Sequence, residues 1–533
     1  MGILQSLKKL LSTRFVTVSI FMLAAIALNA WQAVLPNFHF DNSFSVAAAR
    51  NVAEGKGYIT HQALATDLAT VVYEPINKWP PGYSWLLAGV MKTSGADAII
   101  ATYIVNGIAI IFFLVGIYLT LLALQFPRVA INGFLLFAGF FPYPFLGAWF
   151  ADLTAVSFFM LGIGLIMQAN ASDKNLLLKS ILAALLCSYC IFLKYLYLPV
   201  AILPLVVWGW YSLRIRRMQR FRAAFAGAVL VMTAALVLLL YQSRHSGEPV
   251  YLNPTGRGFF PEHIFEMGAL IPASLLDQDF MTLQLARLLR VQYSTAELLL
   301  RIINYILLAG LFFWVLRWWR KKWIGHLYAY IVLVVSLATT GMLLFMSVTF
   351  APYVAEFTPF WTYLEELRYY AIVVVFIQQG IFWYFLVHKQ ERRKTWFRVA
   401  RAVTALIIGI GILHGAYYLV KQGVIKQKAG IYKENEQVDI AALEVVRKLK
   451  QQYPDLVICS NNHELVNIAS LSGAPVLYDY KLLNTTLQAS KPVMLVAIIR
   501  NDFLPRFEPF LQKYQPVKVD QRYNFSFYLA AIR

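Results

Sequence analysis

Apolar stretches of about 20 residues recur along most of this chain, and each is long enough to cross the roughly 30 Å hydrocarbon layer of a membrane as a helix. The chain is 59% hydrophobic and 14% charged, which leaves too few charges to cover the surface of a soluble protein of 533 residues. A transmembrane barrel would show short alternating segments instead. The sequence therefore predicts a polytopic α-helical membrane protein.

The first apolar stretch, at residues 15–35, follows Lys8, Lys9 and Arg14 and so has the outline of a signal peptide. Its apolar part is about 20 residues long, and no small-residue cleavage pattern stands at its end. We interpret it as a retained membrane helix.

Basic residues gather in short segments between the apolar stretches and give the chain a net charge of +20. In a soluble protein such a charge would suggest a nucleic-acid partner. Here the clusters at 214–222, 317–323 and 388–398 fit the excess of Lys and Arg that is typical of cytoplasmic loops. We expect no nucleic-acid partner, and the alternative is a direct binding role for these clusters.

Placing every basic cluster in the cytoplasm predicts about eleven crossings, with the amino terminus inside and the carboxyl terminus outside. The predicted spans are 15–35, 98–121, 129–147, 153–168, 179–195, 197–212, 223–241, 296–316, 325–349, 369–387 and 400–420. They form one membrane domain over residues 1–420, with its two long outer loops at 36–97 and 242–295.

The outer segments are polar but patterned. Residues 36–97 are too polar to cross the membrane and contain helical patterns at 41–54 and 82–92. Residues 421–533 read as a small outer α/β domain. Its elements are an amphipathic helix at 438–454 and strands at 455–460, 474–479, 492–499 and 526–532. This domain has no glycine-rich nucleotide-binding motif, so we interpret it as a structural or acceptor-orienting module.

Five charged residues from separate parts of the chain fall at the outer membrane face in this topology: Asp41, Lys78, Asp152, Lys194 and Arg368. A carboxylate can take a proton from an acceptor hydroxyl or amine. Lys and Arg can stabilise a phosphate leaving group. A sugar carried on a lipid phosphate requires both kinds of group at the membrane surface, so the set points to transfer of such a sugar.

Each of these residues also has a structural interpretation. Asp41 and Asp152 stand where an aspartate would cap a helix. Lys194 could extend its ammonium to the interface, and Arg368 could anchor a helix there. Tyrosine and tryptophan at helix ends are typical of the aromatic belt of a membrane protein. The joint arrangement on one face is what favours a site.

Five motifs occur here in an order, spacing and predicted membrane side similar to those of the GT-C superfamily of integral-membrane glycosyltransferases. They are DNSFSVAAARNVAEGKGY, NKWPPGYSWLLAG, WFADLTAVSFFMLG, FLKYLYLPVAILP and EELRYYAIVVV. Within that superfamily, residues 1–420 resemble the group of protein O-mannosyltransferases and lipid A aminoarabinose transferases. Three details depart from the group's pattern: Asn42 where many members have Glu, Trp79 between Lys78 and the prolines, and LKY in place of TKG or TRP.

The resemblance implies an inverting glycosyltransferase with a polyprenyl-phosphate-linked sugar as donor. Asp41 matches the base that activates the acceptor, and Asp152 matches a second acidic residue near the site. Lys78, Lys194 and Arg368 match residues near the donor phosphate. Six further residues are expected to line the substrate cavity: Tyr58, Tyr83, Tyr195, Arg257, Glu366 and Tyr369.

No cofactor is predicted. A zinc site could be drawn through His245, His263 and a carboxylate, but their spacing matches no known pattern. The WWD-type motif of metal-dependent oligosaccharyltransferases is absent from the sequence, so a divalent metal is possible but not predicted. The three cysteines imply no disulfide framework.

Two other functions compete with the transferase interpretation. A flippase or transporter of lipid-linked sugars would place charges within the bilayer, whereas the charges predicted here gather at one face. A non-catalytic scaffold would leave Asp41 dispensable. The expected partners are the lipid-linked donor, membrane lipids and a lipid, glycan or protein acceptor in a bacterial inner membrane, with the active site on the periplasmic side. Neither the sugar, the acceptor nor the oligomeric state follows from the sequence.

Overall fold

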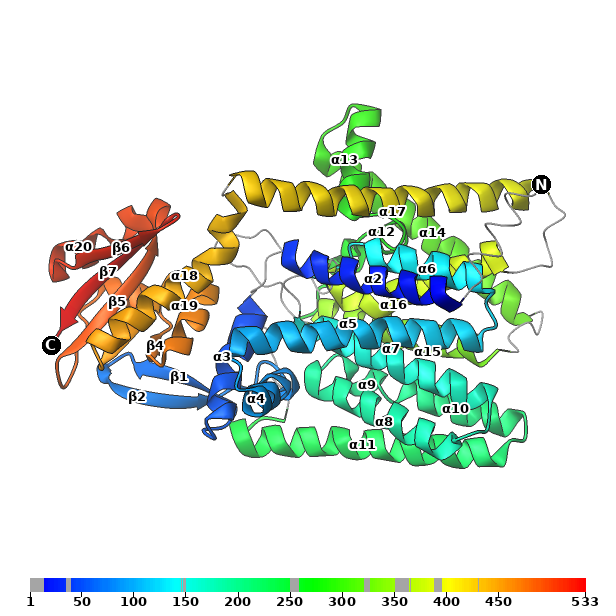
Figure 1. Ribbon diagram of the computed structural model, residues 1–533, viewed down its shortest axis with the longest axis horizontal. Helices are drawn as coiled ribbons and strands as arrows, with labels where there is room; N and C mark the ends of the chain where they lie inside the picture. The colour runs from blue at the N-terminus through cyan, green and yellow to red at the C-terminus, as the bar shows by residue number, and fades with distance from the viewer. Residues whose placement is uncertain are drawn as a thin grey trace.

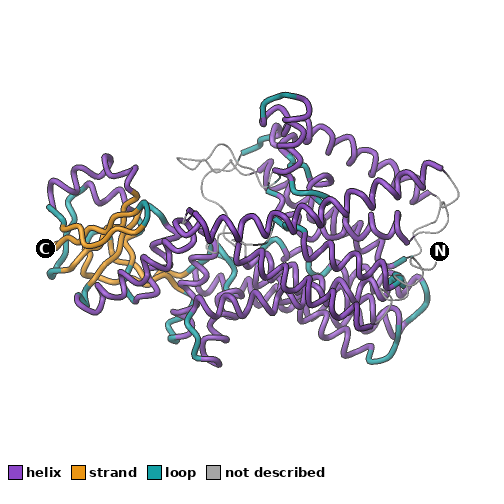
Figure 2. The backbone as a smooth tube through the Cα atoms, turned by 45° about the horizontal axis from the view of Figure 1, so that its top comes forward, coloured by secondary structure: helices purple, strands orange, loops and turns teal. Residues whose placement is uncertain are grey.

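The computed structural model is an elongated molecule in which helices lie side by side in a bundle and a sheet domain occupies one end (Figure 1). Figure 2 shows the strands gathered at that end. The structure describes residues 14–34, 40–144, 146, 150–249, 258–320, 326–349, 364, 366–387, 395–429 and 431–533.

Eight helices of the described chain are long and apolar enough to cross a membrane, which confirms a multi-pass helical membrane protein. They are α2 (Arg14–Val34), α5 (Ala98–Ala123), α7 (Phe150–Ala171), α8 (Leu176–Leu193), α11 (Met218–Ser246), α14 (Tyr293–Arg320), α15 (Leu327–Thr349) and α17 (Thr395–Ala429).

The other three predicted spans also form helices, but shorter ones. They are α6 (Arg128–Phe140), the pair α9 (Tyr197–Val200) and α10 (Leu203–Arg214), and α16 (Ala371–Phe382) with its π-helical continuation η3 (Trp383–Val387). Prolines account for two of these lengths, because proline lacks the backbone N–H that a helix interior requires. Pro142 follows the end of α6, and Pro204 lies in the first turn of α10. The number of crossings and their orientation stay predictions.

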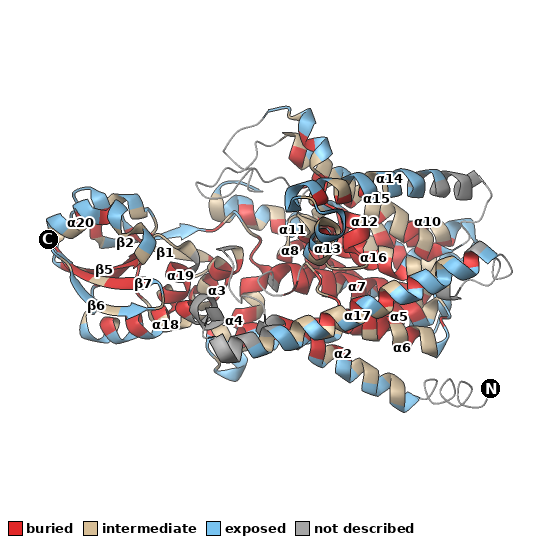
Figure 3. Cartoon of the chain, turned by 90° about the horizontal axis from the view of Figure 1, so that it is seen from above, coloured by how far each residue is buried: buried red, intermediate tan, exposed pale blue. Residues whose placement is uncertain are grey.

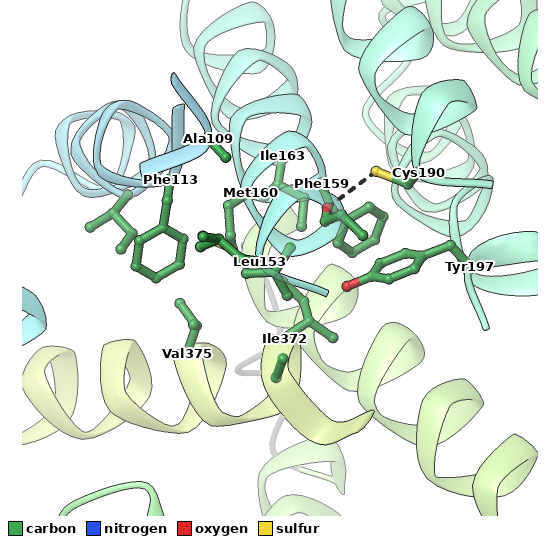
Figure 4. Packing of buried hydrophobic residues seen from close by; sticks show 14 of the residues in the cluster. Ala109, Phe113, Leu153, Phe159, Met160, Ile163, Cys190, Tyr197, Ile372 and Val375 are labelled. Atoms are coloured by element: carbon green, nitrogen blue, oxygen red, sulfur yellow. Dashed lines mark hydrogen bonds between the residues drawn. The ribbon is translucent and has the colours of Figure 1, made fainter. Parts of the chain in front are cut away.

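Helix α7 is the centre of the bundle. Of its membrane-crossing span, 78% is buried, more than in any of the other seven candidate spans. Figure 4 shows Leu153 and Met160 of α7 packed among side chains from α5, α8, α9 and α16. The Cys190 thiol of α8 donates to the Ala155 carbonyl of α7 at 3.3 Å. Figure 3 shows the same arrangement by burial, with the outer faces of α14 and α17 exposed and the centre buried. This enclosure fixes the position of the N-terminal turn of α7.

The segment between α2 and α5 contains the two predicted helices, α3 (Phe40–Ala53) and α4 (Gly82–Ser94). Gly95 ends α4 in the left-handed conformation that glycine adopts without strain. Between the helices lies an antiparallel hairpin, β1 (Ile59–Leu64) and β2 (Asp67–Pro75), which the sequence analysis did not predict. Figure 1 shows α3 crossing the end of the bundle, between the bundle and the sheet domain.

The outer loop before α14 also contains helices. They are η1 (Pro261–Glu266), α12 (Leu270–Ala273) and α13 (Gln278–Leu289). The buried Asn304 amide of α14 accepts from the Ile271 backbone N–H at 2.9 Å and donates to the Gly268 carbonyl at 3.1 Å. These bonds hold the start of α12 against the bundle.

The C-terminal region forms the predicted α/β domain, with a larger sheet than expected. Helix α18 (Ile431–Gln452) is followed by β3 (Leu456–Ser460), α19 (His463–Ala469), β4 (Val476–Leu477), β5 (Val493–Arg500), α20 (Glu508–Tyr514), β6 (Val517–Arg522) and β7 (Phe525–Ile532). Strand β6 was not predicted. The sheet order is β2-β1-β4-β3-β5-β7-β6. Strand β1 pairs in parallel with β4 at Gln62 and Val476, so the hairpin after α3 completes the C-terminal sheet.

Gly116 allows close approach of α5 and α7. A Cβ atom on Gly116 would lie 2.5 Å from the Leu161 backbone nitrogen, inside van der Waals contact. We therefore expect Gly116→Ala to destabilise the protein by about 1–3 kcal/mol through overpacking. Gly107→Ala on the same helix is the control, because its Cβ would meet one atom within 4 Å, Asn29 Oδ1 at 3.8 Å. Unfolding in detergent measures both, and equal loss in the two variants would contradict this packing.

Candidate active site

Two carboxylates lie in the first turns of two different helices. Asp41 is in the first turn of α3, and Asp152 is in the first turn of α7. The backbone N–H groups at a helix N-terminus favour negative charge, so an aspartate is favourable in the first turn of each helix. Asp152 is buried, whereas Asp41 keeps part of its surface exposed. Neither serves simply as a cap, because both enter ion pairs with residues of other elements.

Arg368 joins these carboxylates. It lies in the turn η2 (Leu367–Tyr370), directly before α16, and is 7% exposed. Its Nη1 lies 3.2 Å from Asp41 Oδ2 and 3.8 Å from Asp152 Oδ2, and its Nε pairs with Glu366. Its Nη2 donates to the Tyr369 hydroxyl at 2.9 Å. Three carboxylates therefore surround one buried guanidinium.

Arg368 stays positively charged in this environment. Burial disfavours the charged guanidinium, but Tyr369, Asp152, Glu366 and Asp41 outweigh that penalty and raise the pKa of Arg368 above its ordinary value. A permanent positive charge at this point can hold an anion such as a phosphate.

Lys194 completes the connected network. It follows the last residue of α8 in an extended conformation, and its Nζ lies 3.1 Å from Asp152 Oδ2. Two cations, Lys194 and Arg368, thus share the Oδ2 atom of Asp152. The structure brings together four of the five charged residues selected from the sequence, from α3, α7, α8 and η2.

Lys78 lies beside this network, in the segment between β2 and α4. Its side chain is open to solvent on one side, and its ammonium lies 4.9 Å from the centre of the Trp79 ring. Desolvation by the protein on its other sides lowers the pKa of Lys78, and the charge of Asp41 opposes that shift. Asp41 therefore interacts electrostatically with Lys78 as well as with Arg368.

The predicted cavity residues divide into several groups. Glu366 and Tyr369 contact Arg368, as described above. The Tyr58 hydroxyl donates to the Trp79 carbonyl at 3.1 Å and the Tyr195 hydroxyl to the Asn77 carbonyl at 2.9 Å, so both support the segment that carries Lys78. Tyr83 is buried, and its hydroxyl donates to Asn106 Oδ1 at 3.0 Å inside the bundle. Arg257 lies outside the described residues.

The two histidines considered for zinc contact different carbonyl groups. His245 Nε2 lies 2.6 Å from the Tyr58 carbonyl, and His263 Nδ1 lies 2.7 Å from the Ser347 carbonyl. Within the described part of the chain, no group of three or more His, Cys, Asp and Glu side chains could hold a metal ion.

The C-terminal domain contributes residues that the sequence analysis did not select. His463, the first residue of α19, has its pKa lowered by burial and by the charge of Lys78. Its ring stacks on Tyr478, with 6.4 Å between ring centres, and Tyr478 stacks on Phe44 of α3 at 5.4 Å. No sequence motif marks these residues, because their place beside Lys78 arises from the docking of a distant domain.

A cleft lies between α3, β1 and the C-terminal domain. Its lining includes Phe44, Arg50, Asn51, His61 and Tyr478, and it does not include the charged network. The network, rather than this cleft, carries the charged chemistry.

No protein-family model matches the sequence, and no curated protein matches it. Solved structures match over nearly the whole chain. ArnT from Cupriavidus metallidurans in the apo state gives a TM-score of 0.46 at 14% identity, covering 96% of this chain and 98% of that chain. The same protein bound to undecaprenyl phosphate gives 0.48 at 14% identity, covering 97% and 98%.

A third match is the archaeal oligosaccharyltransferase AglB from Archaeoglobus fulgidus, in complex with an inhibitory peptide and a dolichol-phosphate. Its TM-score is 0.44 at 10% identity, covering 92% of this chain and 70% of that chain. The three matches agree with the resemblance stated from the sequence motifs.

Removal of the Arg368 guanidinium would leave Asp41, Asp152 and Glu366 without their shared cation. We expect Arg368→Leu to destabilise the protein by about 3–5 kcal/mol, because breaking a buried ion pair from one side leaves uncompensated charge. Arg500→Leu is the control, since its ion pair with Asp502 lies at the surface and is worth about 0–1 kcal/mol. Unfolding in detergent measures both variants, and equal stabilities would contradict the network.

The pKa of Lys78 should respond to the charge of Asp41. Because Asp41 raises that pKa, Asp41→Asn should lower it further. The measurement is the pH profile of Lys78 acylation by mass spectrometry, whose midpoint should move to lower pH in the variant. Lys491, which pairs with Asp455 on the C-terminal domain, serves as internal control and should keep the same profile in both proteins. An unmoved Lys78 midpoint would show that the two groups do not interact.

Proposed function

We propose that this protein is a glycosyltransferase that moves a sugar from a polyprenyl-phosphate-linked donor to an acceptor at the outer face of the membrane. The observation that carries the proposal is the connected network of Asp41, Arg368, Asp152 and Lys194 at one end of the helix bundle. It brings a carboxylate next to cations, the two kinds of group that transfer from a lipid phosphate requires.

The donor phosphate is the group that the cations suit. A phosphodiester carries one negative charge, and the departing lipid phosphate gains a second as the glycosidic bond breaks. Arg368 and Lys194 are fixed in the network, and Lys78 stands beside it, so three cations are available for the growing charge. Positioned cations of this kind lower the barrier by stabilising charge that develops in the transition state.

Asp41 is the residue proposed as base. Unlike Asp152 it keeps an exposed part, so an acceptor hydroxyl or amine can reach its carboxylate. The acceptor proton passes to Asp41, the acceptor oxygen or nitrogen bonds to the anomeric carbon, and the bond from that carbon to the lipid phosphate breaks. A single displacement inverts the anomeric configuration. Asp152, buried between Lys194 and Arg368, orients both cations.

The proposed location is the plasma membrane of a bacterium, with the charged network and the C-terminal domain on the periplasmic side. Support comes from the basic residues around the junction of α10 and α11, including Arg214, Arg217 and Arg220. This junction lies at the end of the bundle opposite the C-terminal domain (Figure 1). That distribution fits the cytoplasmic excess of Lys and Arg. Residues 1–420 would then form the catalytic domain and residues 421–533 the outer domain, which the β1–β2 hairpin joins.

Asp41→Asn tests the proposal. The amide cannot take the acceptor proton, so transfer should fall by about 10²-fold or more. The assay uses the protein in membranes or detergent with radiolabelled polyprenyl-phosphate sugars and an extract of envelope lipids and glycans as acceptors. The anomeric configuration of the product, read by NMR, should be opposite to that of the donor.

Asp97→Asn is the matched control. Asp97 caps α5 by accepting from the Ile100 N–H at 2.9 Å, and asparagine caps a helix equally well, so transfer should stay at the wild-type rate. Wild-type transfer in Asp41→Asn would remove Asp41 from the chemistry. Movement of labelled donor across vesicle membranes with no glycosylated product would favour a flippase instead.

A further inference from the structure

We propose that the C-terminal domain positions the catalytic helix α3, and that Arg50 is the positioning residue through which it does so. The catalytic meaning of this inference rests on the proposed function, whereas the mechanical connection does not. The C-terminal domain would then contribute to catalysis by holding Asp41 in position.

Arg50 lies in the last turn of α3, at the end opposite Asp41. Its Nη1 donates to the carbonyls of Ser470 at 3.2 Å and Leu471 at 2.9 Å. These carbonyls follow the C-terminal end of α19, where the helix dipole favours a cation. Its Nε pairs with Glu54 at 2.7 Å, which fixes the guanidinium plane.

Gly473 leaves room for this guanidinium. It has a φ of +91°, and a Cβ atom there would lie 3.0 Å from Arg50 Nη2. A side chain at position 473 would therefore be strained by the backbone conformation and would press on the Arg50 guanidinium.

A second connection between α3 and the C-terminal domain lies at Ser43, nearer to Asp41 along the helix. Ser43 and Arg50 are seven residues apart, which places them on the same face of α3. The fully buried Asn467 of α19 donates from Nδ2 to the Ser43 hydroxyl at 2.9 Å and accepts from the Tyr478 hydroxyl at 2.8 Å. The C-terminal domain thus contacts α3 at two points on one face, about two helical turns apart.

Stacked aromatic rings connect the C-terminal domain and α3 to the segment that carries Lys78. Phe44 of α3 lies between Tyr478 of the C-terminal domain, at 5.4 Å, and Trp79, at 5.1 Å between ring centres. Trp79 follows Lys78 in the chain, so the domain supports the segment that carries this cation too. Aromatic pairs of this geometry contribute beyond their buried area.

The bundle holds another face of α3. The Ser84 hydroxyl of α4 donates to the Ser45 carbonyl at 2.7 Å, and Arg368 pairs with Asp41. Helix α3 is about 20 Å long and moves as a unit, so a shift at Arg50 is transmitted to Asp41. A displacement near 1 Å can reduce the rate of a reaction about 10²-fold when it misplaces a reacting group.

Arg50→Ala in the full chain tests the inference. We expect kcat for transfer to fall by about ten-fold or more, while KM for the donor changes by less than about two-fold, since the phosphate-binding cations stay in place. Arg50→Lys, which keeps a charge and donors, should recover part of the loss. Hydrogen exchange should become about ten-fold faster at the amides of residues 42–46 and stay unchanged in α5 and α7.

Gly473→Ala provides a second variant that leaves Arg50 in the chain and displaces its guanidinium. Its control is Gly247→Ala at the end of α11, where φ is +80° and no atom lies within 4 Å of the added Cβ. Arg500→Ala, in the C-terminal domain, is the control for the loss of an arginine whose ion pair lies at the surface. Both controls should keep wild-type kcat and wild-type exchange in α3.

Two results would overturn the inference. One is unchanged kcat and unchanged exchange of α3 in both Arg50→Ala and Gly473→Ala. The other is faster exchange throughout the protein with equal loss of donor binding, which would indicate a merely structural role. If the wild-type protein transfers no sugar from any polyprenyl-phosphate donor, the proposed function fails, and exchange at residues 42–46 alone decides whether the domain positions α3.

Discussion

The end of the helix bundle that faces the sheet domain depends on the ion pairs of the buried Arg368 guanidinium. A charge taken out of water is costly unless partners surround it, and here the partners come from separate elements: Asp41 from α3, Asp152 from α7 and Glu366 beside η2. Each of these elements must therefore be placed accurately. The enclosure of α7 places Asp152, and the joint between α3 and the C-terminal domain places Asp41. Such a network is a poor source of stability compared with apolar packing, so its presence favours a role in binding or chemistry.

The sequence predicted the elements whose determinants are local. Apolar stretches of membrane length appear as α5, α8, α11 and α15 within a few residues of the expected bounds, because length and apolarity suffice to form a helix in a membrane. The sequence prediction is less accurate where a proline interrupts an apolar stretch. The segment predicted at 197–212 is divided into α9 and α10, and Pro204 begins the second piece. Strands β3, β5 and β7 were predicted for the same reason, since each is a short apolar run bounded by polar residues.

Features that depend on distant pairing were not predictable in this way. The hairpin of β1 and β2 is half exposed and joins β4, more than 400 positions further along the chain, so nothing in residues 59–75 announces its partner. The four ion-paired residues were predictable as a set, because topology alone assigns Asp41, Asp152, Lys194 and Arg368 to one membrane face. Their individual pairings were not, since a topology gives depth in the membrane but no lateral position. His463, Asn467 and Tyr478 gave no signal at all, because ordinary core and helix residues acquire a role here only through docking.

Under the proposed function, Arg368 connects the two halves of the reaction. The Arg368 guanidinium forms an ion pair with Asp41, so the phosphate-binding group and the base are paired with each other. A donor phosphate competes with Asp41 for the same guanidinium, and Lys194 offers it a second contact. As the phosphate takes Arg368, the Asp41 carboxylate loses a hydrogen-bond donor and becomes available to the acceptor. Lys78, whose charge interacts with that of Asp41, is a third cation for the phosphate. The charge arrangement therefore favours donor binding before acceptor activation, and a fixed α3 keeps the released carboxylate within reach of the acceptor proton.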